Sequence, residues 1–225
     1  MVKNFNKKPT SDNLTPLEKV RGRLPLLKAG DIILIHTKKS LLRMLIRAVT
    51  KSYWDHVTMI VFPKGEHTLK HNIVIENTKP PHSLVFFLLD YFLEGTEVHR
   101  LNKYLNDPHK YDVGIKRTSG LSEEHRHRIS TYTIATIDTP YWRLSFWSFF
   151  LAWVWPQYRK WFLRRQRWSC SALIQRAYYE SVDNWNDRLK LVFKEGDLSP
   201  IEIQDLVSPA EIAVSPNAEW IYNKR

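Results

Sequence analysis

The 225-residue sequence contains one cysteine, seven glycines and no long hydrophobic run. Because Cys170 has no partner in the chain, an intramolecular disulfide framework is excluded, and a lone cysteine fits a reducing compartment. The longest apolar stretch, from Ser145 to Trp155, is too short to cross a bilayer as a helix. No segment is long or polar enough to be predicted as a disordered domain. These features predict a chain that folds around an ordinary hydrophobic core.

The N-terminal residues, from Met1 to Pro16, are polar and basic, so we expect no ordinary secretory signal. We therefore expect a cytoplasmic protein, with attachment to a membrane surface as the alternative. The net charge is +11 and the isoelectric point is near 9.7, which favours anionic partners. Charge alone does not separate phosphate, nucleic acid and anionic lipid.

Hydrophobic periodicity and turn residues predict an N-terminal arm over residues 1–24 and a single α+β domain over residues 25–225. Apolar β-rich runs predict strands at residues 31–36, 56–62, 72–78, 83–87 and 97–101. Helical spacing and capping residues predict helices at residues 40–49, 88–94, 121–137 and 169–180, with a short one from residue 208. The strands come early and the helices late, which is typical of the α+β class.

Cys170 follows Ser169, a good N-cap, and is therefore predicted to be the first residue of a helix. The positive end of the helix dipole lowers a thiol pKa, and free backbone N–H groups can hold an oxyanion. A buried structural cysteine, which is the alternative, gains nothing from this position. The placement thus favours a nucleophile.

A thiolate nucleophile needs a base, which is usually histidine. Of the nine histidines, His56 opens a predicted strand directly after a polar segment, and strand ends hold catalytic groups on a rigid frame. His36 ends a strand and is a candidate pocket residue, and His99 is predicted to be structural. The others lie in polar or loop-like surroundings and are expected at the surface: His67, His71, His82, His109, His125 and His127.

Glu76 is the candidate for a residue that orients His56. If the hairpin of residues 56–62 and 72–78 turns near Glu66, His56 and Glu76 stand opposite each other and share a face of the sheet. A glutamate there can hydrogen-bond the imidazole and stabilise its charged form. The alternative is a solvent-facing acid at a strand end, and a slip of one residue would separate the pair.

Several motifs resemble those of the circularly permuted branch of the NlpC-type papain-like superfamily. They are Gly-Asp-Ile-Ile-Leu at 30–34, Asp-His-Val-Thr-Met-Ile at 55–60, Val-Ile-Glu-Asn at 74–77 and Ser-Cys-Ser-Ala-Leu-Ile at 169–174. The pattern is most similar to YiiX/YebB-like cysteine hydrolases, which are related to lecithin:retinol acyltransferase-like proteins, and it covers most of residues 28–220. The resemblance implies a papain-like fold with His56 as base, Glu76 as its polar partner and Cys170 as nucleophile. Thr58 stands where a smaller residue is often found.

Residues 141–168 form an aromatic and basic stretch that is not expected in a minimal member of that branch. Six tryptophans lie in it: Trp142, Trp147, Trp153, Trp155, Trp161 and Trp168. Tryptophan with adjacent arginine favours an anionic membrane interface. An aromatic core helix or a self-association surface is an equally good interpretation, although Pro156 would bend such a helix. Nucleic acid ranks last, because no RNA- or DNA-binding module is found.

These observations predict a cysteine hydrolase or acyltransferase that acts on an amide, ester or thioester bond through Cys170, His56 and Glu76. Peptide-, amide- and lipid-type substrates remain open, and a membrane surface is a candidate partner. No metal or organic cofactor is expected. The alternative is a catalytically silent membrane-surface binding protein with the same fold. The sequence does not indicate the oligomeric state.

Overall fold

The computed structural model describes residues 26–63, 73–77, 96–105, 107–137, 170–183, 193 and 207–223. The predicted arm at 1–24, the strand at 83–87, the helix at 88–94 and the stretch at 141–168 lie outside these residues. The turn between the predicted strands at 56–62 and 72–78 also lies outside the described residues. The described residues combine helices with one antiparallel sheet, which confirms the α+β class.

Six strands make up the sheet, in the order β4-β3-β2-β1-β5-β6, with antiparallel neighbours throughout. They are β1 (Ile32–Thr37), β2 (His56–Phe62), β3 (Ile73–Asn77), β4 (Thr96–Arg100), β5 (Tyr111–Arg117) and β6 (Glu219–Asn223). The predicted strand at 56–62 is confirmed at both ends, and those at 31–36, 72–78 and 97–101 agree within one residue. The sequence interpretation missed β5 and β6.

Five helices are described: α1 (Leu41–Thr50), α2 (Asn102–Leu105), α3 (Glu123–Ala135), α6 (Cys170–Glu180) and α9 (Pro209–Val214). Local capping explains where three of them begin. The side chains of Ser40, Ser122 and Ser208 each accept a hydrogen bond from a backbone N–H in the first turn of α1, α3 and α9. Glu211 completes a capping box with Ser208. The short helix α2 was not predicted.

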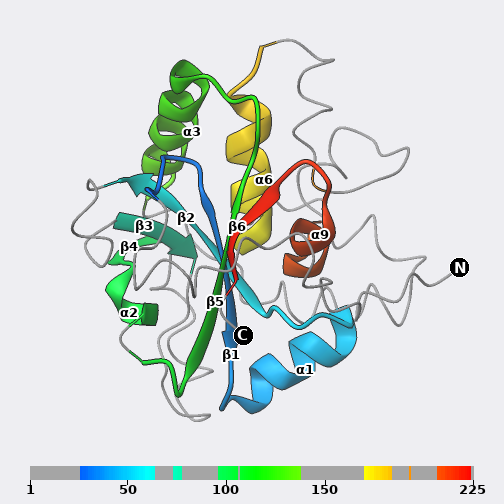
Figure 1. Ribbon diagram of the computed structural model, residues 1–225. Coiled ribbons are helices and arrows are strands. Elements are labelled where there is room, and N and C mark those ends of the chain that lie inside the picture. Colours follow the sequence, from blue (N-terminus) through cyan, green and yellow to red (C-terminus); the bar gives the residue numbers. More distant parts are fainter. Residues whose placement is uncertain are drawn as a thin grey trace, which may run out of the picture.

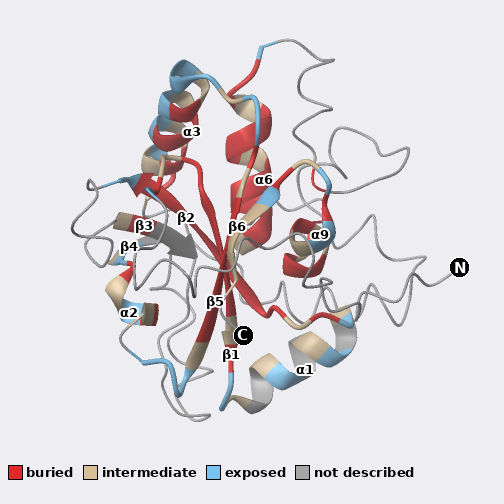
Figure 2. Cartoon of the chain, viewed as in Figure 1, coloured by how far each residue is buried: buried red, intermediate tan, exposed pale blue. Residues whose placement is uncertain are grey.

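The central strands β1, β2 and β5 are almost completely buried, and described helices pack on both faces of the sheet (Figures 1 and 2). On one face, α3 and α6 pack against β2 and against each other. On the other face, α2 packs against β5. Alternate residues of β1 divide between two core clusters, Ile32 and Leu34 in one and Ile33 and Ile35 in the other.

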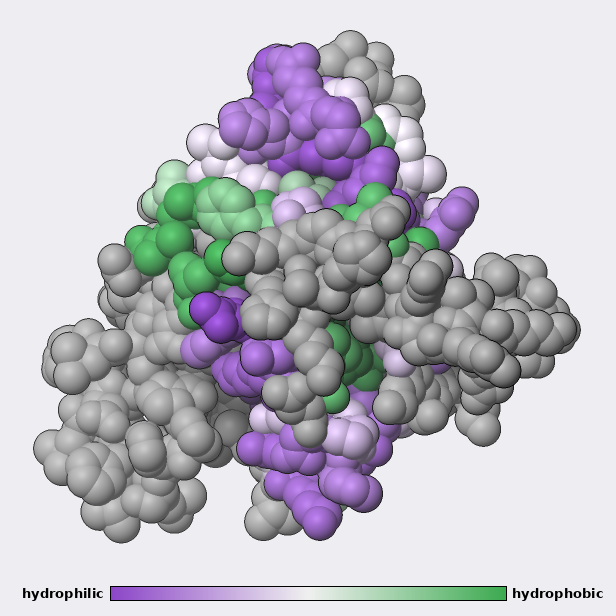
Figure 3. Space-filling model, turned by 60° about the vertical axis from the view of Figure 1, so that its left-hand side comes forward, coloured by the Kyte–Doolittle hydropathy of each residue, from purple (hydrophilic) through white to green (hydrophobic). Residues whose placement is uncertain are grey.

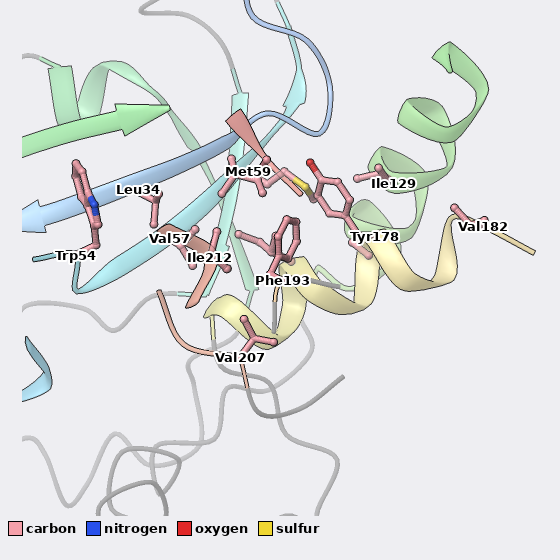
Figure 4. Close-up of a cluster of buried hydrophobic side chains, with 14 residues drawn as sticks. Leu34, Trp54, Val57, Met59, Ile129, Tyr178, Val182, Phe193, Val207 and Ile212 are labelled. Atoms are coloured by element: carbon pink, nitrogen blue, oxygen red, sulfur yellow. The ribbon is translucent and has the colours of Figure 1, made fainter. Parts of the chain in front are cut away.

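The cluster beneath α6 fixes this helix against the sheet, and with it Cys170 (Figure 4). Tyr178 of α6 is fully buried beside Ile129 of α3 and makes an edge-to-face contact with Phe193, with ring centroids 5.1 Å apart. Its hydroxyl donates a hydrogen bond to the carbonyl of Gly30, at the start of β1. The outer face of α3 is polar, and the top of the molecule in Figure 3 is accordingly hydrophilic.

Candidate active site

Cys170 is the first residue of α6, as the sequence predicted. Its backbone N–H therefore has no partner within the helix. The side chain is half-buried and packs against the core cluster beneath α6. The next residue, Ser171, donates a hydrogen bond to the carbonyl of Val207, which anchors this first turn. The predicted cap, Ser169, lies outside the described residues.

His56 opens β2 and is buried, with an exposed fraction of 3%. A hydrogen bond joins its ring to the thiol of Cys170, so the structure brings together the two residues that the sequence singled out. Residues 114 positions apart in the chain thus meet where the start of a central strand reaches the start of a helix. A nucleophile in direct contact with its base is the arrangement that thiol catalysis requires.

The surroundings of Cys170 favour the thiolate. Burial alone raises the pKa of this thiol, but the charge of His56 and the hydrogen bond with its ring more than offset that effect. The charge of Arg43 and a hydrogen bond from the Val57 backbone act in the same direction. The net result is a pKa below that of an ordinary cysteine, so more of the reactive form is present at neutral pH.

Directly before His56, Asp55 is buried and holds the end of β1 and helix α1 together. Its carboxylate accepts hydrogen bonds from the Thr37 backbone at 2.8 Å, the Thr37 hydroxyl at 3.0 Å and Arg47 at 2.6 Å. Arg43 donates to the Asp55 backbone carbonyl at 3.1 Å. These contacts fix the backbone that carries His56. We call Asp55, Thr37, Arg43 and Arg47 the Asp55 cluster.

A second polar group continues from this cluster along the end of the sheet. His36 lies parallel to the ring of Tyr53, with centroids 4.1 Å apart, and its Nδ1 lies 2.7 Å from the Tyr53 carbonyl oxygen. The Tyr53 hydroxyl donates to Asp112 at 2.7 Å, and Lys38 lies 2.8 Å from the same carboxylate. Burial raises the pKa of Asp112, but the hydrogen bonds from Lys38 and Tyr53 outweigh it, so the pKa is lowered.

Glu76 lies in β3, but the register that the sequence suggested is wrong. Met59 pairs with Ile75 and Ile60 with Val74, so continuation of this ladder would set Thr58, rather than His56, opposite Glu76. A bulge between Ile60 and Phe62 changes the register by one residue along this ladder. A shift of two residues keeps the same face of the sheet, and diagonal neighbours about 7–8 Å apart remain within reach of long side chains. The structure does not describe the Glu76 side chain, so its role stays a prediction.

The remaining described histidines lie away from this pair. His109 and His127 are exposed, and His99 and His125 are half-buried on β4 and α3. His67, His71 and His82 lie outside the described residues. Within the described part of the chain, no group of three or more His, Cys, Asp or Glu side chains is placed to hold a metal ion. No helix described by the structure combines the length and hydropathy needed to cross a bilayer.

The fold and the Cys170–His56 contact are those of a papain-like thiol enzyme in which the histidine strand precedes the cysteine helix. Residues 26–222 match the family described as permuted papain-like amidase enzyme, YaeF/YiiX, C92 family, and the chain belongs to this family. The family resemblance seen in the sequence is thus confirmed. Membership places the chain among hydrolases of the cysteine-peptidase-like class.

Among solved structures, the chain is similar to one described as the metalloprotein yiiX from Escherichia coli O157:H7. The TM-score is 0.54 at 19% sequence identity, over 88% of this chain and 98% of that one. At this identity the similarity supports the fold. Curated proteins give no significant match.

The sequence interpretation missed Arg43 and Asp55 as parts of this site. The sequence interpretation gave Arg43 no role, and it included Asp55 only as part of the motif at residues 55–60. The available signal was a pair of arginines four residues apart on α1, followed by an acid directly before the candidate base. Arginines at this spacing share one helix face, which suits a common partner.

Proposed function

We propose that the chain is a cysteine hydrolase or acyltransferase that cleaves an amide, ester or thioester bond, with Cys170 as nucleophile and His56 as general acid and base. The contact between the Cys170 thiol and the His56 ring is the observation that carries this proposal. It favours catalysis over a binding-only role, because a binding protein does not require a thiol with a lowered pKa.

In the first half of the reaction, the thiolate sulfur attacks the carbonyl carbon of the substrate and forms a C–S bond. The carbonyl π electrons move to oxygen, where the backbone N–H at the start of α6 can stabilise the negative charge. As the tetrahedral intermediate collapses, the bond to the leaving amine, alcohol or thiol breaks. The His56 imidazolium donates a proton to that leaving group, which leaves a neutral imidazole and an acylated Cys170.

In the second half, His56 removes a proton from water, or from another acceptor, as that acceptor attacks the thioester carbonyl. The C–S bond then breaks and the thiolate is released beside the imidazolium. Water gives hydrolysis and a second nucleophile gives acyl transfer. Glu76 on β3 is proposed to orient His56 and to stabilise its positive charge, as the shared face of the sheet allows.

Alkylation of the chain by iodoacetamide tests this proposal, because the only cysteine in the sequence is Cys170. The lowered pKa predicts that the rate stays high towards mildly acidic pH, where an ordinary thiol is protonated. His56→Ala should move the pH–rate curve towards that of a free thiol. A rate no faster than that of a free thiol at neutral pH, unchanged by His56→Ala, would falsify the proposal.

Peptidyl and fatty-acyl activity-based probes, used side by side, would distinguish the substrate classes. Labelling by either probe should disappear in Cys170→Ala. Preferential labelling by the fatty-acyl probe supports a lipid-type substrate, and preferential labelling by the peptidyl probe supports a peptide or amide. The association of the 141–168 stretch with anionic membrane is a further proposal, which vesicle co-sedimentation with and without anionic lipid would test.

A further inference from the structure

Helix α1 directs two arginines towards one aspartate. Arg43 and Arg47 are four residues apart, so they lie on the same face of α1, and both reach Asp55. The helix begins after its N-cap Ser40, and two residues separate this cap from the end of β1. Because the cap fixes the start of the helix, it also fixes which residues face Asp55.

The two arginines do not share the carboxylate equally. Arg47 lies 2.6 Å from an Asp55 oxygen and also donates to the Thr37 carbonyl at 2.8 Å. Thr37 supplies two more donors to the carboxylate. Arg43 is 3.8 Å from the carboxylate and directs its hydrogen bond to the Asp55 backbone carbonyl instead. Among the described residues, two guanidinium groups face one carboxylate, and Arg43 makes the longer contact with it.

This excess positive charge lies beside the nucleophile. Arg43 contacts the peptide carbonyl that directly precedes His56, and His56 is hydrogen-bonded to Cys170. A thiolate and an imidazolium balance each other, and among the described residues Arg43 is left with a share of the Asp55 carboxylate that Arg47 also contacts. The Arg43 side chain is 24% exposed and Cys170 is half-buried, so solvent reaches both side chains. Guanidinium groups bind carboxylates and phosphates through paired N–H donors.

We propose that Arg43 is the anion-binding residue of the Cys170 site, and that the substrate carries a carboxylate or phosphate group close to the acyl bond that is cleaved. This inference rests on the proposed function and narrows its substrate class. Arg43 would hold the anionic group while Cys170 attacks the neighbouring carbonyl carbon.

Two alkylating reagents test the proposal on Cys170 alone. Both reagents alkylate a thiol by displacement of iodide, but iodoacetate carries a carboxylate and iodoacetamide carries a neutral amide. The readout is the ratio of the two alkylation rates. A change in the pKa of Cys170 alters both rates by the same factor and therefore does not affect the ratio. We expect Arg43→Gln to lower the iodoacetate-to-iodoacetamide ratio about tenfold, and Arg43→Lys to keep most of it. The positive charge of His56 also attracts iodoacetate, but it does so equally in all variants. The role of Arg43 is therefore judged from the change in the ratio on substitution.

Arg176→Gln is the matched control. Arg176 lies on the same helix as Cys170, roughly 9 Å further along its axis, is 25% exposed and is also paired with a carboxylate. Removal of this charge should leave the ratio unchanged. An equal fall in Arg176→Gln and Arg43→Gln would show a general charge effect and would overturn the assignment of Arg43.

A second measurement uses the unmodified protein, in case Arg43→Gln does not fold. N-acetylglycine and glycerol 3-phosphate should slow alkylation by iodoacetamide, whereas neutral N-acetylglycinamide should not. Protection by the first or the second compound separates a carboxylate from a phosphate requirement. If alkylation is fast and none of the three compounds slows it more than the others, the role of Arg43 is overturned and the Cys170–His56 pair is not. If alkylation is slow and its rate is unchanged by His56→Ala, the proposed function is overturned instead.

Discussion

Two aspartates occupy equivalent positions in this fold but lie at opposite ends of a strand pair. Asp31 directly precedes β1 and Asp55 directly precedes β2, and these two strands are antiparallel neighbours. Both carboxylates are buried, and two arginines face each of them. The same local pattern, an acid at the entry to a central strand, therefore occurs once at each end of the sheet.

The surroundings of the two acids differ. Asp31 accepts two hydrogen bonds from Arg117 of β5, at 2.8 and 2.6 Å, and lies 4.0 Å from Arg126 of α3. Arg126 is 6% exposed and also donates to the Ala29 carbonyl. We call Asp31, Arg117 and Arg126 the Asp31 cluster. It ties the start of β1 to β5 and α3.

The Asp55 cluster lies instead next to His56, and the charge of Arg43 acts on the thiol of Cys170. A buried ion pair is by itself weak evidence for either stability or function. The two clusters therefore differ in their neighbours rather than in their ion pairs. We expect the Asp31 cluster to govern folding and the Asp55 cluster to govern both folding and reactivity.

The largest effect on stability is expected from Asp31→Asn. It removes the buried carboxylate that Arg117 and Arg126 face and leaves the almost fully buried Arg126 with only the exposed Glu123, 4.0 Å away, among the described residues. This should lower the free energy of unfolding by about 3 kcal/mol. Urea denaturation measures this loss. The rate at which iodoacetamide alkylates Cys170 in the folded protein should not change. A large change in that rate would mean that the two ends of the sheet are coupled.

A smaller loss of stability, about 2 kcal/mol, is expected from Asp55→Asn, because its arginines are more exposed than Arg126. Here reactivity should respond as well. Removal of the negative charge leaves Arg43 and Arg47 unbalanced, which should lower the pKa of Cys170 further. The pH–rate curve for iodoacetamide should then move to lower pH, and a shift to higher pH would contradict this account of the cluster.

Lys116 sharpens the comparison, because it is a buried amine held by carbonyl groups. Its Nζ donates to the carbonyls of Ile212, Ala213 and Ser215, at 3.0, 2.9 and 2.9 Å, at the end of α9. Lys116→Met should lower the free energy of unfolding by about 1–3 kcal/mol at pH 9, because these carbonyls lose their donor. Lys39→Met, at an exposed position, is the control and should cost less than about 0.5 kcal/mol.

The effect of Lys116→Met should also depend on pH. Burial lowers the pKa of Lys116 from 10.5 to about 7, so between these values the unfolded chain binds more protons than the folded one. The free energy of unfolding of the unmodified protein then rises with pH in this window, and the difference from Lys116→Met should grow. A difference that shrinks from pH 7 to pH 10 would show that the charged form is the more stable one in the fold.

Much of the fold could be predicted from local signals. The continuous apolar run of β2 and the serine caps of α1, α3 and α9 depend on neighbouring residues alone, and so does the start of α6 at Cys170. The strand β5 was missed because Asp112, Gly114 and Lys116 are poor strand formers. Gly114 is required there, since a side chain would meet the rings of Trp54 and Trp220 at less than 3 Å. Such a long-range contact cannot be read from the sequence.

The site was predictable to a similar extent. Cys170 and His56 each have a local signal, namely a helix start and a strand start. The register between β2 and β3 does not, because it depends on a bulge and on the length of a turn. The pairing of Arg43 with Asp55 depends on how α1 returns over the end of the sheet. Helical spacing predicts which arginines share a face but not which acid they meet.

The smallest effect on stability is expected from Tyr178→Phe. This variant tests whether α6 connects the Asp31 cluster to Cys170. Tyr178 lies on the same helix as Cys170 but donates its hydrogen bond to Gly30, next to Asp31. Loss of this bond should lower the free energy of unfolding by about 1 kcal/mol, because the phenyl ring still fills the core. The ratio of iodoacetate to iodoacetamide rates should stay at the unmodified value. If that ratio falls as it does in Arg43→Gln, α6 transmits changes from the Asp31 end to the thiol, and the two clusters are not independent.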